Sequence, residues 1–376
     1  MNILDLFAGT GGFSLGFENA GLFTKHAVEL DRFACETLEN NFKDTNVHCA
    51  DILMMKDSFI KKEFRNTDII LGGPPCQGFS VVGPSQYGKK DPRNKLVFEM
   101  CRFTELLQPQ VCIIENVPGL IRTTKKNLIL EKLLKDFHKI GYKESIHLLD
   151  SKYFGVPQSR KRAFLIFTKE NAIDITFKKN ESFISVYDAI SDLDLLALPE
   201  NQMPISYEKK PKNKYQKLMR ENSRKIFNHA PMKHTKRLIE RFKNIKIGQS
   251  LKDVSIEYGQ RKRGSNEIDI NKRFKMNNQR LDPNKYSLAI AASFQSNFVH
   301  PFKHRNLTAR EGARLMSFPD RYIFHGPRTL MSKSLLIKEG RESEIGLSQY
   351  NQIGNAVPPE LANTIASTLI NHGIIR

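Results

Sequence analysis

A cysteine stands among small residues directly after an apolar run. Residues 74–80 read PPCQGFS, and residues 68–71 before them read DIIL, a pattern that predicts a buried strand. Two prolines fix the turn, and the glycine after the cysteine leaves room for a bound group. Because alternating strand–helix folds present reactive side chains to ligands at such strand ends, Cys76 is a candidate nucleophile. The alternative is a buried, inert thiol, which the surrounding motif disfavours.

A carboxylate follows Cys76 one strand–helix unit later. Residues 111–115 read VCIIE, a strand that ends in Glu115 and continues into Asn and Val. This spacing predicts that Glu115 and Cys76 lie at the same edge of a sheet. Further along, Arg160 and Arg162 stand two residues apart, so their side chains can share one face of a strand. For these two arginines a solvated basic strand edge stays open as an alternative.

The first predicted strand ends in a turn that is rich in glycine. Residues 5–12 read DLFAGTGG, and such a turn lets the backbone approach a ligand at the start of a helix. The dinucleotide pattern G-x-G-x-x-G is absent, because Gly12 follows Gly11 at once. After the second and third strands, Glu29 could accept from ribose hydroxyls and Asp51 from an adenine amino group. Each acid alone is more often a solvated loop carboxylate, but three strand-end signals in order favour an adenosine-bearing cofactor.

Alternating strands and helices must position these residues. Strands are expected at 3–7, 25–30, 47–50, 68–71, 111–115 and 162–168. Helices are expected at 13–20, 33–42, 95–107, 128–140, 235–242, 308–316 and 359–370. The alternation predicts an α/β, doubly wound, mostly parallel sheet. Since the periodicity fades after about residue 169, we expect one domain built from 1–169 and 306–376 and a smaller one at 170–305.

The charge of the chain is concentrated in that smaller domain. The 376 residues carry a net charge of +19. Residues 201–280 hold 22 Lys and Arg against 7 Asp and Glu, a net of +15. A general preference for lysine would spread the charge along the chain. The clustering therefore predicts a polyanionic partner, with nucleic acid the leading candidate.

The cysteines favour a reducing compartment. Besides the motif cysteine there are four, Cys35, Cys49, Cys101 and Cys112, and no C-x-x-C spacing occurs. An odd total without that spacing argues against a disulfide framework and against a structural zinc site, so these four are expected to be small core residues. Because the first strand starts almost at Met1, we expect no signal segment, and because no apolar run is long enough to span a bilayer, we expect no membrane span.

Six motifs occur in an order that resembles a known family. To the glycine turn, PPCQGFS and ENV, the chain adds QSRKR at 158–162, RE at 310–311 and QIGNAV at 352–357. In this order they resemble the cytosine-5 DNA methyltransferases, and among these the bacterial type II restriction–modification methylases. The resemblance covers nearly everything except the middle of the basic segment. It implies a class I, Rossmann-like methyltransferase domain that uses S-adenosyl-L-methionine, together with a basic target-recognition domain.

The resemblance also implies roles for individual residues. Cys76 would add to C6 of a cytosine extruded from duplex DNA, and Glu115 would hold that base at N3 and its exocyclic amine. Arg160 and Arg162 would position the base and the cysteine loop, and Arg310 with Glu311 would organise the second domain. The implied cofactor-binding residues are Phe7, Ala8, Gly9, Thr10, Gly11, Gly12, Glu29, Leu30, Asp51, Ile52, Pro75, Asn355 and Ala356. No metal is expected in the reaction.

Further expectations concern the DNA and the partners. The polar loop 81–93 is expected to close over the DNA, with Ser80 and Gln86 as plausible contacts. The implied partners are double-stranded DNA and a cognate restriction endonuclease. The protein is expected to be a monomer in the bacterial cytoplasm, at the nucleoid.

Two rival functions stay open. The first is an RNA (tRNA) cytosine-5 methyltransferase of the same fold. The second is a catalytically silent DNA-binding homologue, hinted at by Ala289 where the family often carries Thr. The glycine pattern and the basic domain disfavour a nicotinamide oxidoreductase.

Overall fold

The computed structural model describes residues 1–75, 95–121, 128–169, 174–193, 203–262, 264–265, 267–269, 277–329 and 331–375. The chain divides into two compact units. The first is built from residues 1–155, 160–181 and 356–376, and the second from 156–159 and 182–355. The glycine turn and the predicted catalytic strands lie in the first unit, and the basic segment lies in the second.

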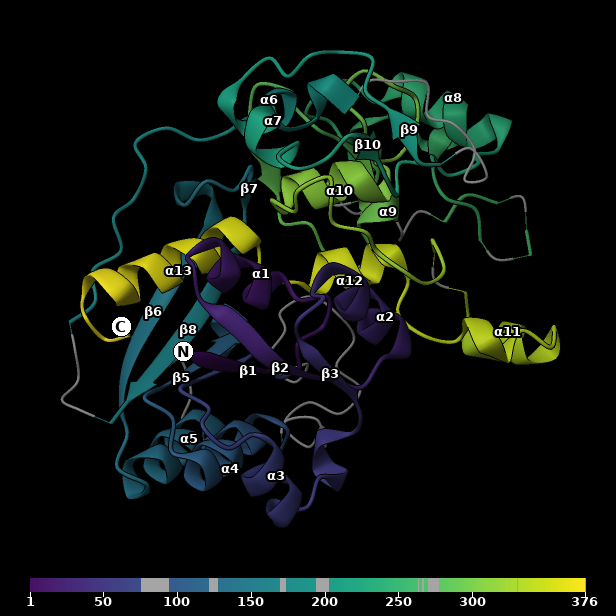
Figure 1. Ribbon diagram of the computed structural model, residues 1–376. Helices are drawn as coiled ribbons and strands as arrows, with labels where there is room; N and C mark the ends of the chain where they lie inside the picture. The colour runs from purple at the N-terminus through teal and green to yellow at the C-terminus, as the bar shows by residue number, and fades with distance from the viewer. Residues whose placement is uncertain are drawn as a thin grey trace. The chain divides into compact units, whose positions relative to one another are not determined.

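The first unit is built on a seven-stranded sheet (Figure 1). Its strands are β1 (Asn2–Leu6), β2 (Phe23–Glu29), β3 (Asn46–Cys49), β4 (Ile69–Gly72), β5 (Val111–Asn116), β6 (Lys143–Asp150) and β8 (Lys161–Thr168). They lie in the order β3-β2-β1-β4-β5-β8-β6, and β8 alone runs antiparallel to its neighbours. This arrangement is the class I methyltransferase fold and confirms the predicted doubly wound, mostly parallel sheet.

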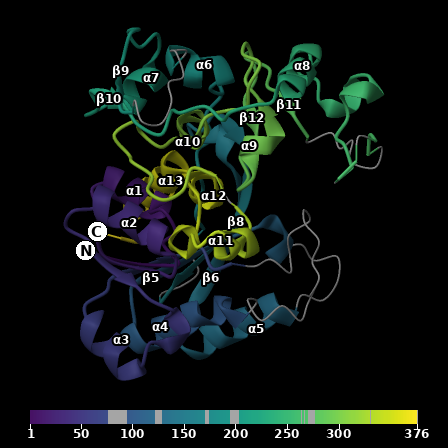
Figure 2. The same ribbon diagram turned by 90° about the vertical axis from the view of Figure 1, so that its right-hand side faces the viewer.

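Helices cover both faces of this sheet (Figures 1 and 2). One face carries α1 (Gly12–Asn19), α2 (Arg32–Asn41) and α13 (Pro359–Asn371), and the other carries α3 (Asp57–Glu63), α4 (Val97–Leu107) and α5 (Leu128–Lys139). The last helix returns to the first: a Cβ atom added to Gly16 in α1 would lie 2.3 Å from Cβ of Ala362 in α13. Only glycine permits this close approach, which fixes the C-terminal helix against the start of the fold.

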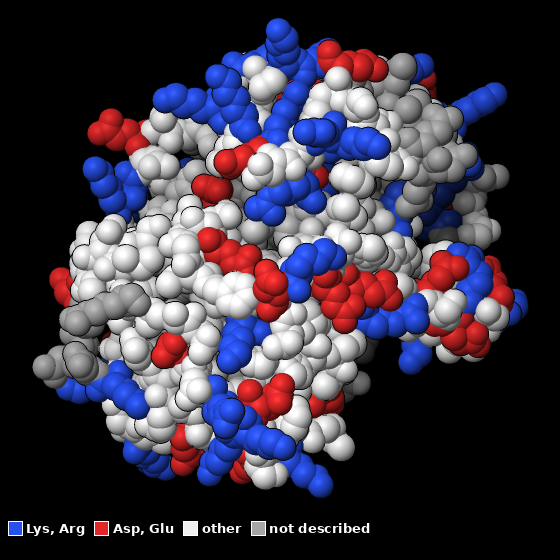
Figure 3. Space-filling model, viewed as in Figure 1, with Lys and Arg blue, Asp and Glu red and all other residues white. Residues whose placement is uncertain are grey.

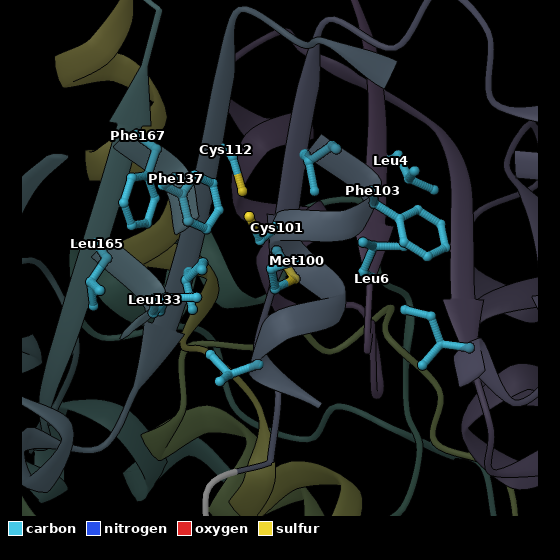
Figure 4. Packing of buried hydrophobic residues seen from close by; sticks show 14 of the residues in the cluster. Leu4, Leu6, Met100, Cys101, Phe103, Cys112, Leu133, Phe137, Leu165 and Phe167 are labelled. Carbon is cyan, nitrogen blue, oxygen red and sulfur yellow. The ribbon is translucent and has the colours of Figure 1, made fainter. Parts of the chain in front are cut away.

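One large apolar cluster of the first unit lies between the sheet and the helices on the side of α3, α4 and α5 (Figure 4). Strand residues such as Leu4 and Leu165 point toward helix residues such as Phe103 and Leu133. Phe137 of α5 stacks on Phe167 of β8 with ring centroids 3.7 Å apart. Central strands that are buried on both faces need near-continuous apolar runs, which is why the sequence predicted them well.

Three of the four cysteines outside the motif are core residues, as predicted. Cys35, Cys101 and Cys112 are buried, and burial raises the pKa of the Cys101 and Cys112 thiols to about 12. The prediction was wrong for Cys49, which is exposed. The reason is its position at the end of β3, an edge strand that the sheet covers on one side only. All four are free thiols.

The second unit consists of short elements. Its helices include α6 (Val186–Ile190), α7 (Lys214–Met219), α8 (Lys236–Asn244), α9 (Phe294–Asn297), α10 (Ala309–Leu315), α11 (Lys333–Lys338) and α12 (Gln349–Asn355). Its strands are two-residue segments: β7 (Gln158–Ser159), β9 (Ile205–Ser206), β10 (Lys225–Ile226), β11 (Gln279–Arg280), β12 (Ser287–Leu288) and β13 (Phe298–Val299). Such short elements bury little apolar surface each, so buried polar contacts contribute much of the unit's order.

A buried charged network surrounds α10. Thr308 caps this helix in a capping box with Glu311, as its sequence predicts. Arg305 donates to both oxygens of Glu311, at 2.8 and 2.7 Å, and this pairing holds the pKa of that carboxyl well below its usual range despite burial. Arg310 is fully buried and donates 2.9 Å hydrogen bonds to the carbonyls of Phe227 and Pro319. Through these contacts Arg310 and Glu311 hold segments of the second unit together.

The bounds of the compact units differ from the expected domain bounds. Residues 306–355 were expected with the first domain, but they cluster with the second unit. The reason is that α10 is tied to the basic segment: Thr308 contacts His229 at 2.8 Å, and Arg310 donates its backbone N–H to Asn228. The function of each unit remains a prediction. Among the described residues, no helix combines the length and the apolar character needed to cross a bilayer.

Candidate active site and cofactor cradle

The turn after β1 has a backbone that few residues can adopt. Phe7, Gly9 and Gly11 have positive φ angles of 56°, 55° and 77°. Gly11 is the N-cap of α1, and its N–H donates to the carbonyl of Ala8 at 2.9 Å. A Cβ added to Gly9 would meet no atom within 4 Å, so the space beside this turn is open. The turn therefore leaves its backbone accessible to a ligand.

Glu29 ties this turn to the end of β2. One carboxylate oxygen accepts from the N–H of Gly9 at 2.7 Å, and the other accepts from the N–H groups of Leu30 and Asp31, both at 2.9 Å. Burial raises the pKa of Glu29, and these backbone hydrogen bonds oppose the rise. Since each carboxylate oxygen can accept more than one hydrogen bond, the group can serve the turn and a bound hydroxyl together.

The end of β3 adds a second carboxylate. Asp51 accepts from the N–H of Leu53 at 3.0 Å and so caps the 3₁₀ helix η1 (Ile52–Met54). Ile52 is buried, whereas the side chain of Leu30 is 67% exposed. The N–H of Ala50 donates to the carbonyl of Glu29 at 2.9 Å, which joins the ends of β2 and β3. Because β3, β2 and β1 are neighbours in the sheet, the predicted cofactor residues of all three strand ends form one cradle.

Asp5, the first residue of the glycine-turn motif, had no role predicted from the sequence, but its side chain braces the cradle. Asp5 in β1 is 1% exposed and accepts from the hydroxyl of Ser14 in α1 at 2.6 Å. Burial raises the pKa of Asp5 to about 7, and the Ser14 hydrogen bond opposes the rise. The pair fixes the start of α1 against β1. The nine-residue separation gives no local pattern, so only the fold brings the two together.

The base-side candidates meet where β5 and β8 run side by side. Glu115 is at the end of β5, and its Oε1 lies 2.8 Å from Nε of Arg162 in β8. The two side chains are 12% and 18% exposed. A Cβ on Gly73, which follows β4, would lie 3.6 Å from Oε2 of Glu115. The structure thus brings Glu115, Arg162 and the segment leading to the cysteine motif together at one edge of the sheet.

Arg160 is buried and reaches the C-terminal motif. It is 3% exposed, its N–H donates to Oγ of Ser151 at 3.2 Å, and its Nη2 donates to the carbonyl of Ala356 at 3.2 Å. Burial and the charge of Arg162 hold the pKa of this guanidinium well below its usual value. Through Ala356 the arginine fixes the C-terminal motif. Asn355, the exposed last residue of α12, belongs to the second unit.

Asn116 connects the end of β5 to the segment that leads into the cysteine motif. Its side-chain amide donates to the carbonyl of Pro74 at 3.1 Å, and its amide oxygen accepts from the N–H of Val117 at 2.8 Å. It is 3% exposed. The first described segment of the chain ends at Pro75, and the next begins at residue 95. Cys76, Ser80, Gln86 and the loop 81–93 lie outside the described residues.

The second unit presents many positive charges. On the face drawn in Figure 3, Lys and Arg side chains are more numerous than Asp and Glu around α6, α7 and α8. Not every cation of the basic segment is on the surface: Arg241 donates to the carbonyls of Tyr258 and Gly259, and Arg280 to those of Ile245 and His300. Both side chains are buried, so these two arginines stabilise the fold and counting charges overstated the surface available to a polyanion.

Comparison with known proteins agrees with this geometry. The family model described as C-5 cytosine-specific DNA methylase matches residues 1–371. The Type II methyltransferase M.DdeI of Desulfomicrobium norvegicum is 43% identical, with 98% of this chain and 88% of the relative covered. The Type II methyltransferase M1.HphI of Haemophilus parahaemolyticus is 31% identical, with 98% of this chain and 87% of the relative covered.

Solved structures share the fold. A DNA modification methyltransferase encoded within a prophage (E. coli) has a TM-score of 0.75 and 27% identity, with 99% of each chain covered. The Spodoptera frugiperda DNMT2 structure, with a TM-score of 0.57 and 17% identity over 98% and 99% of the chains, shares the fold alone. The extent of the family match, together with the relative at 43% identity, shows that this chain belongs to the C-5 cytosine-specific DNA methylases.

Proposed function

We propose that this cytosine-5 DNA methyltransferase takes its methyl group from S-adenosyl-L-methionine and reacts with a flipped cytosine through a covalent bond to Cys76. The observation that supports this most directly is the hydrogen bond from Asn116 to the carbonyl of Pro74. It fixes the segment leading into the cysteine motif against the strand end that carries Glu115. A nucleophile and a base-holding carboxylate must be held together in this way for addition to C6.

The cradle at the ends of β1, β2 and β3 fits the cofactor. The open side of Gly9 leaves space for the methionine part, and the carboxylates of Glu29 and Asp51 can accept from ribose hydroxyls and the adenine amino group. Leu30 and Ile52 supply apolar surface beside them. When bound, S-adenosyl-L-methionine supplies an electrophilic methyl group on its sulfonium.

The chain's own residues prepare the cytosine. The thiolate of Cys76 adds to C6, which makes C5 nucleophilic. The carboxyl of Glu115, protonated on the oxygen that does not face Arg162, donates to N3 and so stabilises the charge that develops on the ring. Once C5 carries the methyl group, its proton passes to water, the C5–H electron pair re-forms the C5–C6 double bond, and the Cys76 thiolate leaves C6. Arg162 holds Glu115 in position through the 2.8 Å ion pair. These steps require the base outside the duplex, because C6 is not accessible within the stack.

The basic second unit supports a role in binding duplex DNA. Lys and Arg on its surface would contact phosphates, and a few residues would read the bases. The names of the relatives place them among type II methyltransferases. We therefore infer that this chain acts in the bacterial cytoplasm as a monomer, and that it methylates one short sequence and so protects host DNA from a cognate endonuclease.

The proposal can be tested in a host that lacks cytosine methylation. Expression of the full chain, followed by bisulfite sequencing, should show 5-methylcytosine in one short recurrent DNA sequence, and Cys76→Ala should abolish it. Purified wild type should incorporate methyl groups from labelled S-adenosyl-L-methionine into duplex DNA and leave host tRNA unmodified. Methylation of tRNA alone would replace the DNA proposal with the RNA one, and cofactor binding without any methyl transfer would support a silent homologue.

A further inference from the structure

Two imidazoles and a carboxylate converge in the first unit on the side of the sheet that packs against α3. Nδ1 of His26 lies 3.2 Å from Nε2 of His48, and Nε2 of His48 lies 3.9 Å from Oε1 of Glu63. One nitrogen or oxygen atom from each residue lies within 4.8 Å of the others. None of the three belongs to the cofactor cradle or to the base-side residues.

The fold positions the two rings before any ion is present. His26 is in β2 and His48 in β3, and these parallel neighbours pair Val28 with His48, so both imidazoles project from the same face of the sheet. Phe64, directly after α3, packs edge-on against both rings, with centroids 5.2 Å from His26 and 5.1 Å from His48. This packing holds the ring orientations, and Glu63 is the last residue of α3.

One hydrogen bond can join the two rings, and Glu63 lies at 3.9 Å, beyond hydrogen-bond distance. Nε2 of His48 carries at most one proton, so it cannot donate to both His26 and Glu63. If it carries none, the carboxylate of Glu63 faces a lone pair. A metal ion instead uses one lone pair from each of the three groups. Tetrahedral zinc with bonds of about 2.0 to 2.1 Å separates its ligand atoms by about 3.3 Å, close to the spacing of His26 and His48.

The site is accessible and chemically suited to a borderline cation. His48 also lines an open hollow of about 480 Å³, shared with Met54, Met55 and Phe59. Water could reach an ion from this hollow as a fourth ligand. Two imidazoles and one carboxylate form a donor set that suits Zn²⁺ more than Mg²⁺ or Ca²⁺.

We propose that His26, His48 and Glu63 bind one divalent transition metal ion, with Zn²⁺ the leading candidate. The ion joins the strands β2 and β3 to the last residue of α3. It takes no part in methyl transfer, so it stabilises the first unit and leaves the reaction to the residues already described.

Zinc titration of the full chain tests the proposal. Protein freed of metal by chelation should bind one equivalent of Zn²⁺ in isothermal titration calorimetry, and its melting temperature should rise. Glu63→Gln should weaken binding by about tenfold or more, since even outer-shell changes around metal sites cost that much. The side chain of Glu63 is 38% exposed, so this variant is expected to fold. Glu36→Gln, at an exposed position in α2, is the matched control and should bind as wild type does.

Cobalt distinguishes this site from the cysteines. Co²⁺ bound by nitrogen and oxygen should give the visible spectrum of a tetrahedral ion without a thiolate charge-transfer band, and Glu63→Gln should lose that spectrum. The proposal is overturned if wild type binds no Zn²⁺ at micromolar concentration, if Glu63→Gln binds with wild-type affinity, or if the Co²⁺ spectrum shows thiolate ligation. Each readout is independent of methyltransferase activity.

Discussion

Glu115 and Arg162 form an ion pair of 2.8 Å across the antiparallel strands β5 and β8. The guanidinium holds the carboxylate at the edge of the sheet reached by the segment that leads into the cysteine motif. The position of a base-holding group decides how well a bound cytosine is aligned for addition, and a misplacement of about 1 Å can cost about a hundredfold in rate.

Arg162→Gln is therefore expected to lower kcat/KM by about tenfold to a hundredfold. Arg162→Lys should recover only part of it, because an ammonium does not reproduce the planar guanidinium. The measurement is steady-state methylation of duplex DNA. Arg102→Gln is the control, since Arg102 pairs with Asp57 in the same unit away from these residues and its loss should leave kcat/KM unchanged. Equal activity of Arg162→Gln and wild type would remove the proposed role.

Asn116→Ala should affect both stability and rate. It leaves the buried carbonyl of Pro74 and the N–H of Val117 without their partner, which costs about 1 to 3 kcal/mol of the free energy of unfolding. Because the segment leading into the cysteine motif loses its tether, kcat should fall further than that instability explains. Urea unfolding and single-turnover methylation give the two quantities. Asn371→Ala, at an exposed position at the end of α13, should change neither.

The structure makes stability depend on pH through Asp5. Burial raises its pKa from 3.8 to about 7 in the folded chain. The folded chain therefore keeps a proton on Asp5 that the unfolded chain releases above about pH 4, so the free energy of unfolding falls as the pH rises from about 4 to 7. Asp5→Asn removes this fall in the free energy of unfolding, because the asparagine amide does not titrate. Relative to wild type, the variant should gain at most about 4 kcal/mol between pH 4 and pH 8.

The comparison must be made as a difference between variant and wild type. Burial also raises the pKa of Glu29 and of Glu360, so both proteins retain a slope in the same direction. Urea unfolding at several pH values from 4 to 8 gives the difference. A difference that does not change with pH would show that Asp5 titrates in the folded chain as it does in the unfolded one.

Glu311→Gln should destabilise the second unit. It removes the charge that Arg305 and the buried His300 face, and breaking a buried ion pair costs about 3 to 5 kcal/mol. Denaturant unfolding should show the loss, and DNA binding should weaken with it. Glu344→Gln breaks a pair with Arg341 on the exposed surface and should have no measurable effect. A stable Glu311→Gln protein would mean that the buried pair contributes little.

Much of the first unit could be predicted from the sequence because its strands are apolar runs buried on both faces. β6, one of the two edge strands, escaped prediction because its apolar residues Ile146 and Leu148 are 38% and 52% exposed and form no continuous buried run. α3 escaped because, apart from Ile60, its seven residues lack a buried stripe. The second unit's two-residue strands are too short to produce any periodicity.

For the candidate site, the sequence predicted individual residues but not the contacts between them. Motif residues such as Glu29 and Glu115 could be named from their positions at strand ends, because parallel strands gather their carboxyl ends at one edge. Their partners could not. The contact of Glu29 with Gly9 depends on β1 and β2 being neighbours, and that of Glu115 with Arg162 depends on the antiparallel insertion of β8. Those are properties of the sheet order, which no local pattern contains.

The central claim is that the sulfur of Cys76 bonds to C6 of cytosine, and a mechanism-based trap tests it most directly. Duplex DNA with 5-fluorocytosine at the target position cannot lose a C5 proton after methyl transfer, so the covalent complex should persist. With S-adenosyl-L-methionine supplied, wild type should form one denaturation-resistant adduct whose cross-linked peptide contains Cys76, and Cys76→Ala should form none. Efficient methylation of ordinary DNA without any such adduct, or an equal adduct with Cys76→Ala, would contradict the account.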